Sequence, residues 1–533
     1  MIRSLVGEQP GPADRMTMPL ADLSSTVAST SGACPPAVIG ASTTVLGDTV
    51  YVFGGRRVSS QTMTSDLWAL DLHSRQWTFL QEAAASPTPP PRYFHSTCAR
   101  GDRQLVLFGG MTSESTLSAL NDVWVFDVRA GRWTCQAAGG EHEAPQPRYA
   151  HLGCVRGEEL YIIGGQDMEN KYVEEVSVFS LATSTWTFHG PFAQQCGAYR
   201  SVVTDTPEGV CIYSNYNFTD VRRELSFCLA DPAAEELKVR DCSRLMPGPL
   251  PPGLRFPCGD VCANHLILSG TFLTSTAQSY SVWAMSLDKL EWQQIDGGKV
   301  FANGSWNRAV AWPAQNKLVI LGDLHRRLSP DYEQRRLNFK HLLFLDLEAH
   351  GLASFSSPVP SPAAVELGKH LLNTTHGGDM EIISLDRVAF PVNSRLLSSR
   401  WGTYFLFRFT TALPPSSSLV PGAPASPTFP ASARPRQLYL PHPSPIVGAI
   451  LTYLYTTTLP EGLGIDVLVA LLPPALSYEL PLLAKLVKEA LHACLNEGLH
   501  PTAIYEAGAL SHERGLQVRA LRVLVDQRRA EVT

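Results

Sequence analysis

The dipeptide Gly-Gly recurs in the first third of the chain with a period of 55 residues. Its three copies each end a short apolar run, and they are Gly54-Gly55, Gly109-Gly110 and Gly164-Gly165. A tryptophan follows each copy about twenty residues later, at Trp77, Trp133 and Trp186. A fixed period of this size is typical of repeat folds, in which each unit buries its apolar faces against its neighbours. The period therefore restricts the fold to an array of similar units.

Each period reads as four short strands separated by turn residues. In the second period the predicted strands cover about 93–100, 104–110, 121–128 and 132–136. A four-stranded sheet with two apolar faces cannot bury both alone, so we expect such sheets to stack radially as a β-propeller. We interpret the glycine pairs as turns that a side chain would block, and the tryptophans as apolar bodies between neighbouring sheets.

The repeat weakens after Gly190 but does not end there. Val210–Tyr213 lacks the glycines, whereas the run ending at Gly270, with Trp292 after it, restores most of the pattern. A sixth copy ends at Gly322. We therefore predict six blades over about 34–357, with a terminal strand that either belongs to a seventh blade or closes the ring. Residues 1–33 are predicted to be a disordered N-terminal segment.

These residues resemble the kelch repeat, which combines a hydrophobic run, Gly-Gly and a later tryptophan. The spacing from Leu70 to Trp77, from Phe126 to Trp133 and from Phe179 to Trp186 is seven residues each time. The resemblance implies a kelch propeller that presents its loops to other proteins.

Composition agrees with an all-β repeat and excludes some classes of function. The 533 residues include 40 glycines and 40 prolines, with only 17% charged residues, which suits a turn-rich chain. The net charge of −6 argues against nucleic-acid binding. No run of 18 apolar residues predicts a membrane span, and no apolar leader begins the chain. With eleven cysteines lacking C-x-x-C spacing, we expect buried free thiols and a cytoplasmic protein.

The longest loops are predicted on one face of the propeller, and they carry clustered basic residues. We propose as partner-binding the residues Arg222, Arg223, His325, Arg326, Arg327, Arg335 and Arg336. Two interpretations stay open for them: a solvated loop, or a docking site for an acidic or phosphorylated partner. Arg92 and Arg148, which repeat in phase with His95 and His151, are interpreted as structural.

A different domain follows a predicted linker at 358–364. Strands are predicted at Asp379–Ile383 and Arg387–Pro391, then helices, interrupted by a disordered Pro/Ser-rich insertion at about 411–436. The segments Phe390–Arg400 and Ile450–Thr457 resemble those of a BTB/POZ domain, with Asn393 in place of the usual histidine and Asp379 as a loose match to an acidic residue. The resemblance implies an α/β domain over 365–530 that dimerises or docks a second protein.

Kelch repeats followed by a BTB domain resemble fungal regulators of Ras signalling, cell shape and sporulation. We therefore predict a non-enzymatic adaptor or scaffold, with a component of a small-GTPase pathway as one possible partner. Three alternatives stay open: a cullin-3 ubiquitin-ligase substrate adaptor, a cytoskeletal scaffold, and a kelch-propeller oxidoreductase. The sequence contains no catalytic motif such as G-x-S-x-G or H-E-x-x-H, so we expect no enzymatic activity, cofactor or metal.

Overall fold

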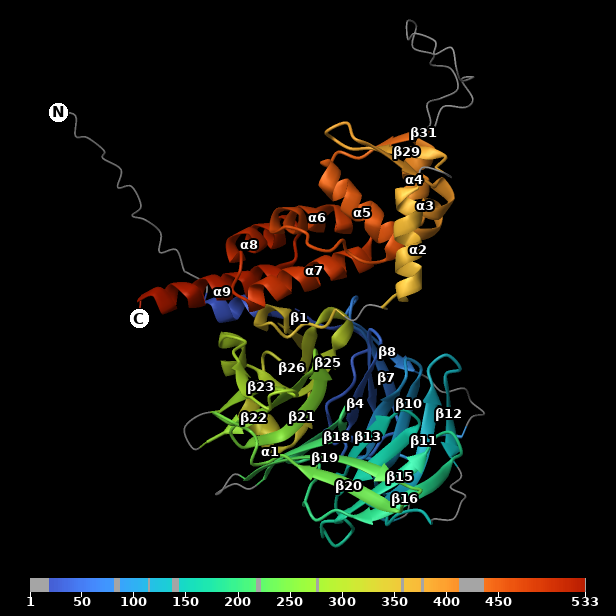
Figure 1. Ribbon diagram of the computed structural model, residues 1–533. Helices are drawn as coiled ribbons and strands as arrows, with labels where there is room; N and C mark the ends of the chain where they lie inside the picture. The colour runs from blue at the N-terminus through green and yellow to red at the C-terminus, as the bar shows by residue number, and fades with distance from the viewer. Residues whose placement is uncertain are drawn as a thin grey trace, which may run out of the picture. The chain divides into compact units, whose positions relative to one another are not determined.

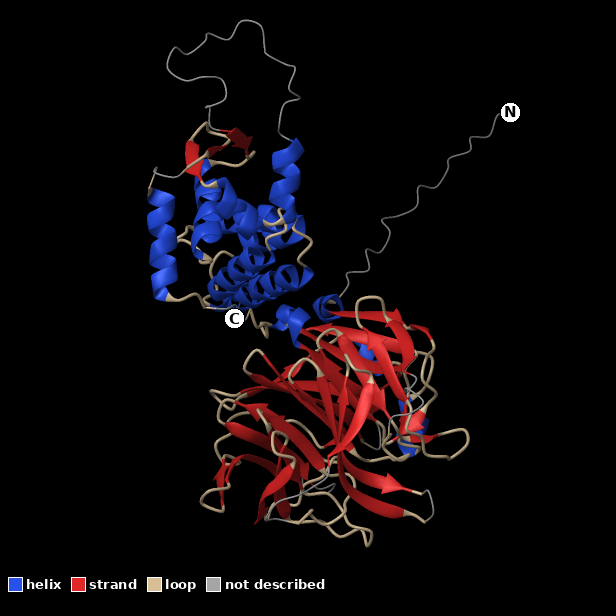
Figure 2. Cartoon of the chain, turned by 90° about the vertical axis from the view of Figure 1, so that its right-hand side faces the viewer, coloured by secondary structure: helices blue, strands red, loops and turns tan. Residues whose placement is uncertain are grey.

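The computed structural model describes residues 19–80, 87–113, 116–136, 143–216, 222–274, 278–355, 359–374, 378–411 and 436–532. Residues 1–18 and residues 412–435 of the predicted insertion lie outside the described residues. The chain divides into two compact units at Ser354. The first is built from strands and the second mainly from helices (Figures 1 and 2).

The first unit consists of six antiparallel sheets of the propeller type. The first three, each from its innermost strand outward, are β4 (Ser42–Leu46), β5 (Thr49–Phe53), β7 (Leu67–Asp71) and β8 (Gln76–Leu80); β9 (Ser96–Arg100), β10 (Gln104–Thr112), β11 (Ser118–Asp127) and β12 (Arg132–Gln136); and β13 (Leu152–Arg156), β14 (Glu159–Ile163), β15 (Glu175–Ser180) and β16 (Thr185–Pro191). A short strand, β2 (Ser31–Gly32), pairs in parallel with β8.

The other three sheets follow the same order. They are β17 (Ser201–Thr206), β18 (Gly209–Tyr216), β19 (Arg222–Asp231) and β20 (Glu236–Asp241); β21 (Leu254–Cys262), β22 (His265–Leu273), β23 (Gln278–Ser286) and β24 (Trp292–Ile295); and β25 (Ser305–Trp312), β26 (Lys317–Asp323), β28 (His341–Asp346) and β1 (Ser25–Ser29). The innermost strands are neighbours in cyclic order, from β4 through β9, β13, β17 and β21 to β25 and back to β4. The six sheets therefore form a closed ring around a channel.

The ring is closed by a strand from the beginning of the chain. β1 pairs antiparallel with β28, with Val27 opposite Leu343, and supplies the outermost strand of the sixth sheet. The prediction that residues 1–33 are all disordered is therefore wrong for residues 20–32, which form η1 (Leu20–Ser24), β1 and β2. The terminal strand that the sequence left open closes the sixth blade, and no seventh sheet exists in the described part of this unit.

Apolar cores lie between successive sheets. Trp133 of the second sheet packs against Phe53 of the first, with ring centroids 5.0 Å apart. Trp186 of the third sheet packs in the same way against Phe108 of the second, at 5.8 Å. Because each buried tryptophan covers the face of the preceding sheet, the sheets stabilise one another.

The Gly-Gly turns bring neighbouring sheets close together. Gly109 and Gly110 have φ values of +60° and +95°. A Cβ on Gly109 would lie 3.0 Å from the Arg148 carbonyl oxygen, and one on Gly110 would lie 2.8 Å from the His95 Cβ. A side chain at either position would therefore both strain the backbone and clash with the adjoining loop.

The repeated arginines and histidines are internal. The fully buried Arg92 donates two hydrogen bonds of 2.7 Å to Asp122 and one of 3.0 Å to the Gly109 carbonyl. His151 lies 2.8 Å from the Ser96 hydroxyl through Nε2. Burial, together with the charge of Arg148, lowers the pKa of His151 to about 3, so the ring is neutral in the folded protein.

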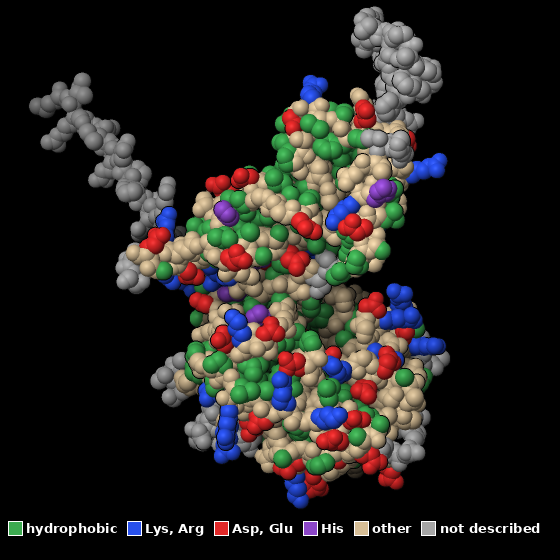
Figure 3. Space-filling view, viewed as in Figure 1, with side chains coloured by type: hydrophobic (Ala, Val, Ile, Leu, Met, Phe, Trp, Pro, Cys, Tyr) green, Lys and Arg blue, Asp and Glu red, His purple; other side chains and the backbone are tan. Residues whose placement is uncertain are grey.

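Short elements cover the loop face of the propeller. A three-stranded sheet is formed by β27 (Arg336–Leu337), β3 (Val38–Ile39) and β6 (Arg56–Arg57). The helix α1 (Leu328–Glu333) precedes β27 in the loop of the sixth sheet. Three further 3-10 turns are η2 (Lys299–Ala302), η3 (Pro313–Gln315) and η4 (Glu348–His350). Basic and acidic side chains are interspersed on the face of this unit seen in Figure 3.

The second unit packs helices around one apolar core beside a small sheet. Its strands are β29 (Met380–Ile383), β30 (Ala389–Val392) and β31 (Arg436–Tyr439), with β29 in the middle. Its helices are α2 (Pro362–Asn373), α3 (Ser394–Trp401), α4 (Thr403–Thr411), α5 (Ser444–Thr456), α6 (Ile465–Ser477), α7 (Pro481–Asn496), α8 (Pro501–Leu510) and α9 (Arg514–Val532). The last three residues of the predicted linker, 362–364, belong to α2.

The start of α3 is held by the residues noted in the sequence. The Asn393 side chain accepts hydrogen bonds of 3.1 Å from the backbone N–H groups of Arg395 and Leu396, as an N-cap does. Asp379 accepts from the backbone and hydroxyl of Ser394 at 2.7 and 2.6 Å. The Tyr455 hydroxyl of α5 accepts from the Asn393 N–H at 2.9 Å. These contacts tie α3 to the sheet and to the central helix.

All eleven cysteines are unpaired. Burial raises the pKa of the Cys98 and Cys211 thiols to about 12. Of the helices in the described residues, none combines the length and apolar character that a bilayer span requires.

Removal of β1 should destabilise the propeller. A chain that begins at residue 31 lacks the strand paired with β28 and exposes an edge in the sixth sheet. We expect its thermal unfolding midpoint to fall by several degrees relative to a chain beginning at Pro19, measured by calorimetry. Equal midpoints for the two chains would show that β1 does not close the ring.

Stability should fall below neutral pH in part because of His151. Its folded-state pKa of about 3 lies below the usual 6.5, so the unfolded chain binds more protons between these values. The contribution is complete above about pH 6.5 and is lost as the pH falls toward 3. Relative to His151→Gln, the wild type should lose up to about 1.4 kcal/mol of unfolding free energy per pH unit in this window. Denaturant titrations at several pH values test this, and parallel curves would contradict it.

Candidate functional site

The loop face of the propeller carries a cluster of aromatic side chains around the channel. Because neighbouring strands are antiparallel, loops between the second and third strands of a sheet lie on the same face as loops between successive sheets. Both kinds of loop contribute. We call this cluster the aromatic mouth; it consists of Tyr93, Phe94, Tyr149, Tyr199, Phe256 and Tyr332.

Backbone hydrogen bonds between successive loops fix the aromatic mouth in place. They run from the Phe94 N–H to Gly40, from Ala150 to Phe94, from Ala198 to Ala150 and from Phe256 to Tyr199, at 2.8 to 3.1 Å. Phe94 and Phe256 adopt left-handed φ values of +54° and +47°. This conformation is an outlier for a bulky residue and persists only where the surroundings impose it. The loops are therefore held rigidly, and these two rings are directed by backbone geometry.

The rings of the aromatic mouth contact one another in sequence. Their centroid separations are 4.6 Å for Tyr93–Phe94, 6.4 Å for Phe94–Tyr149, 5.5 Å for Phe94–Tyr199, 5.8 Å for Tyr199–Phe256 and 5.8 Å for Phe256–Tyr332. Together they border a cavity of about 670 Å³ that opens on this face. The cavity is large enough for side chains of a partner.

Arg335 lies at the centre of the aromatic mouth. Its guanidinium carbon is 5.3 Å from the ring centroid of Tyr199, 5.9 Å from Phe256 and 6.0 Å from Phe94. These distances are those of cation–π contacts, which orient the side chain without neutralising it. Burial raises the pKa of the Tyr199 hydroxyl although the charge of Arg335 lowers it, so Tyr199 is a neutral hydrogen-bonding group.

The charge at the aromatic mouth is positive. Arg200, Arg255 and Arg335 line the cavity, and Arg56 lies over the Tyr93 ring at 5.5 Å. Glu333 is the one acidic residue among those that line it in the described chain. The site is therefore suited to an acidic surface or segment.

Arg326, which the sequence placed in the partner-binding set, is used inside the fold. It donates hydrogen bonds of 2.5 to 3.0 Å to Asp331, a fully buried residue of α1. Burial alone would raise the pKa of this carboxyl, but hydrogen bonds from Arg326, Ser305 and Asn338 outweigh it and hold the pKa below its usual value. Arg326 therefore anchors the loop that carries Arg335.

The other predicted residues are distributed between the site and its surroundings. Arg336 lines a deeper cavity with Arg335 and donates to the Asn338 side chain at 2.8 Å. Arg327 is exposed, and His325 packs its ring against His341. Arg222 and Arg223 lie in β19 and line neither of these cavities. The structure thus brings only Arg335 and Arg336 of the set together.

The aromatic residues were missed as functional candidates. Tyr93 and Tyr149 follow the structural arginines at equivalent positions of successive repeats, which drew attention to their structural neighbours instead. Phe94 and Phe256 carry no local motif, since their importance comes from loops that meet only in the closed ring. The available signal was an aromatic residue in loops that otherwise vary.

The channel beneath the site is polar. A cavity of about 560 Å³ is lined by innermost strands and contains hydroxyl groups such as Ser42, Ser96 and Thr97. His95 and His151 line it too, and each is within 2.8 Å of a serine hydroxyl. In the described parts of the chain, no group of three or more His, Cys, Asp or Glu side chains is arranged to hold a metal ion.

Comparison with known proteins agrees with the sheet arrangement. The KLHDC2/KLHL20/DRC7 kelch-repeats domain matches residues 7–202. Protein ral2 of Schizosaccharomyces pombe is 30% identical over 582 aligned positions, which cover 93% of this chain and 93% of that protein. The chain belongs to the family of protein ral2. The match spans both units, so the ral2 family shares the kelch propeller and the helical C-terminal region.

Other relatives match a smaller part of the chain. Acyl-CoA-binding domain-containing protein 5 of Arabidopsis thaliana is 30% identical over 41% of this chain and 32% of that protein. Host cell factor of Drosophila melanogaster is 27% identical over 29% of this chain and 12% of that protein. The solved structure of YjhT aligns with a TM-score of 0.40 at 16% identity, covering 54% of this chain and 91% of that chain. The fold assignment rests on the strand pairing and on the kelch match.

Arg326 and Arg335 should differ in their effects on stability. Arg326→Ala leaves the buried Asp331 carboxylate without its main partner, and should cost about 2–3 kcal/mol of unfolding free energy. Arg335→Ala removes an exposed side chain and should cost about 1 kcal/mol or less. Denaturant unfolding of both variants, with Arg327→Ala as the control, measures the difference. Equal losses for Arg326→Ala and Arg327→Ala would contradict the anchoring role.

Proposed function

We propose that the chain is a non-enzymatic protein-interaction adaptor whose propeller binds a partner at the aromatic mouth. The observation that carries the proposal is the position of Arg335 between three aromatic rings on a positively charged face. Aromatic and arginine side chains dominate the binding energy of protein interfaces. Their backbone is held by hydrogen bonds between loops, so little conformational entropy is lost on binding.

We further propose that the partner presents an acidic segment. Four arginines contact or line the aromatic mouth, with Glu333 as the acidic residue beside them. A partner with the opposite charge would gain both affinity and a faster rate of association. This retains the docking interpretation of Arg335 and Arg336 and replaces the remaining arginines of the predicted set with Arg56, Arg200 and Arg255.

The second unit is proposed to be a BTB/POZ-type domain that dimerises or docks another protein. Supporting observations are the three-stranded sheet, the helix α3 that starts directly after β30 with Asn393 as its cap, and the contact of Tyr455 with that cap. Dimerisation would place two propellers on one particle and raise avidity without new contacts.

We propose a signalling role in the cytoplasm, in Ras-linked or nutrient-linked fungal development. The proposal is supported by the similarity to protein ral2 over 93% of both chains and by the order of the two domains. Recovery of a cullin together with the chain would favour the ubiquitin-ligase alternative. Recovery of a small GTPase or its exchange factor would favour the signalling role.

Affinity purification of the full chain tests the adaptor role. Proteins that bind the wild type should be lost from a Tyr149→Ala, Arg335→Ala variant, with affinity reduced about 10- to 100-fold, because two central contacts are removed. Phe79→Ala is the matched control, since Phe79 is 42% exposed on the outer strand β8, away from the channel. An identical set of captured proteins on the wild type and the mouth variant would contradict the proposal.

A further inference from the structure

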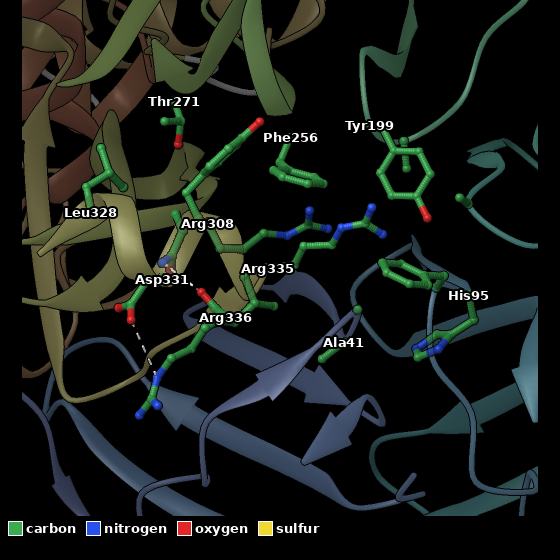
Figure 4. A pocket seen from close by; sticks show the side chains of 17 residues that line it. Ala41, His95, Tyr199, Phe256, Thr271, Arg308, Leu328, Asp331, Arg335 and Arg336 are labelled. Carbon is green, nitrogen blue, oxygen red and sulfur yellow. Dashed lines mark hydrogen bonds and ion pairs between the residues drawn. The ribbon is translucent and has the colours of Figure 1, made fainter. Parts of the chain in front are cut away.

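A smaller cavity lies below the aromatic mouth, between the loops and the inner strands. Its volume is about 90 Å³, and its polar lining residues include Asn307, Arg308, Asp331, Arg335 and Arg336. We call it the arginine cavity. Figure 4 shows Arg308 and Arg335 extending toward the space bordered by Phe256, Tyr199 and His95.

Positive charge in the arginine cavity exceeds negative charge. Three guanidinium groups face one carboxylate, that of Asp331, which is already hydrogen bonded to Arg326. His95 adds no charge, because burial and the nearby Arg92 lower its pKa well below the usual value. An enclosed excess of cations strongly favours the entry of an anion.

Arg308 keeps most of its hydrogen-bonding capacity available. Its Nε donates a 2.9 Å hydrogen bond to the Thr43 hydroxyl. Within the described residues it forms no ion pair with a carboxylate. A guanidinium group has five N–H donors in a planar fork that matches carboxylate and phosphate oxygens. Arg308 is thus a donor group directed into the channel without a matching acceptor.

A β-bulge sets the direction of Arg308. The register between β25 and β26 shifts between Trp306 and Arg308, which leaves Asn307 as the extra residue. Bulges are over-represented beside binding sites, where they redirect side chains. The neighbouring inner strand β21 shifts its register as well, between Arg255 and Cys258. The two irregular strands thus meet at the arginine cavity.

Asn307 supplies a second, independent sign of a ligand. Its Nδ2 donates to the Arg336 carbonyl at 2.9 Å and to the Ser305 hydroxyl at 3.1 Å, which fixes the orientation of the amide. Its Oδ1 is buried and has no hydrogen-bond partner in the described structure. A buried acceptor left unsatisfied is costly and requires an explanation. A ligand that carries a donor next to its anionic group would satisfy it.

From the excess of guanidinium groups and the unpartnered acceptor, we infer that the arginine cavity binds one anionic side chain of a partner peptide. Arg308 and Arg335 bind its carboxylate or phosphate oxygens, and a peptide N–H of the same segment satisfies the Asn307 oxygen. The volume of about 90 Å³ admits the end of one side chain. This inference rests on the proposed function, because it requires a protein partner at the aromatic mouth.

Calorimetric titration of the full chain tests the inference. The probes are three blocked pentapeptides, acetyl-Gly-Ala-X-Ala-Gly-amide, in which X is glutamate, phosphoserine or glutamine. We expect at least one charged peptide to bind at least tenfold more tightly than the glutamine peptide. Arg308→Gln and Arg335→Gln should each remove this preference, whereas Arg327→Gln, at an exposed position outside the cavity, should retain it. Arg335→Gln keeps the test valid if Arg308→Gln does not fold.

The outcomes separate the sources of the anion and the two proposals. Tighter binding of the glutamate peptide assigns a carboxylate, and tighter binding of the phosphoserine peptide assigns a phosphate. Equal binding of all three peptides, or the same loss of preference in Arg327→Gln, would overturn the inference. If the peptides bind equally while mouth variants still lose their captured proteins, the adaptor proposal stands and the arginine cavity does not.

Discussion

The structure depends on a hydrogen bond between each Gly-Gly turn and the loop that begins the next sheet. The N–H of Gly55 donates to the Arg92 carbonyl at 2.8 Å, and the N–H of Gly110 donates to Arg148 at 3.0 Å. The same arginine then turns back into the following sheet, where Arg92 binds Asp122. Each inter-sheet loop is therefore fixed from both sides. Since the next residues along the chain are aromatic, this bond also determines where the aromatic mouth lies.

This arrangement separates stability from recognition along a few residues of chain. Arg92 and His95 are buried and engaged inside the propeller, whereas Tyr93 and Phe94 between them face the channel opening. The left-handed backbone at Phe94 allows this alternation, at a cost that the surrounding hydrogen bonds offset. A rigid support beneath variable loops is the general condition under which loops acquire binding functions.

The sequence predicted those parts of the fold that depend on local spacing. Glycine pairs and tryptophans identified the first three blades because each motif lies within one repeat. The fourth blade was harder to recognise, because Ser214-Asn215 replaces the glycines while the Asn215 N–H still donates to the Arg200 carbonyl at 3.1 Å. β1 was missed because its partner, β28, lies more than 300 residues away in sequence.

The site was harder to predict than the fold because it is assembled from several blades. Arg326 and Arg335 look alike in the sequence, yet one pairs with Asp331 and the other lies between aromatic rings. Asp331, five residues after Arg326, was the local clue to internal pairing. No local clue existed for Phe256 or Arg308, whose orientations depend on register shifts in β21 and β25.

Hydrogen–deuterium exchange of the full chain, with and without a captured partner, tests the central claim most directly. The account predicts slower exchange on binding in the segments that form the aromatic mouth: 93–95, 149–151, 198–200, 255–257 and 332–336. The tight turns at the other end of the channel, such as residues 101–103 and 157–158, should exchange at unchanged rates. Protection of those turns with no change at the aromatic mouth would contradict the account.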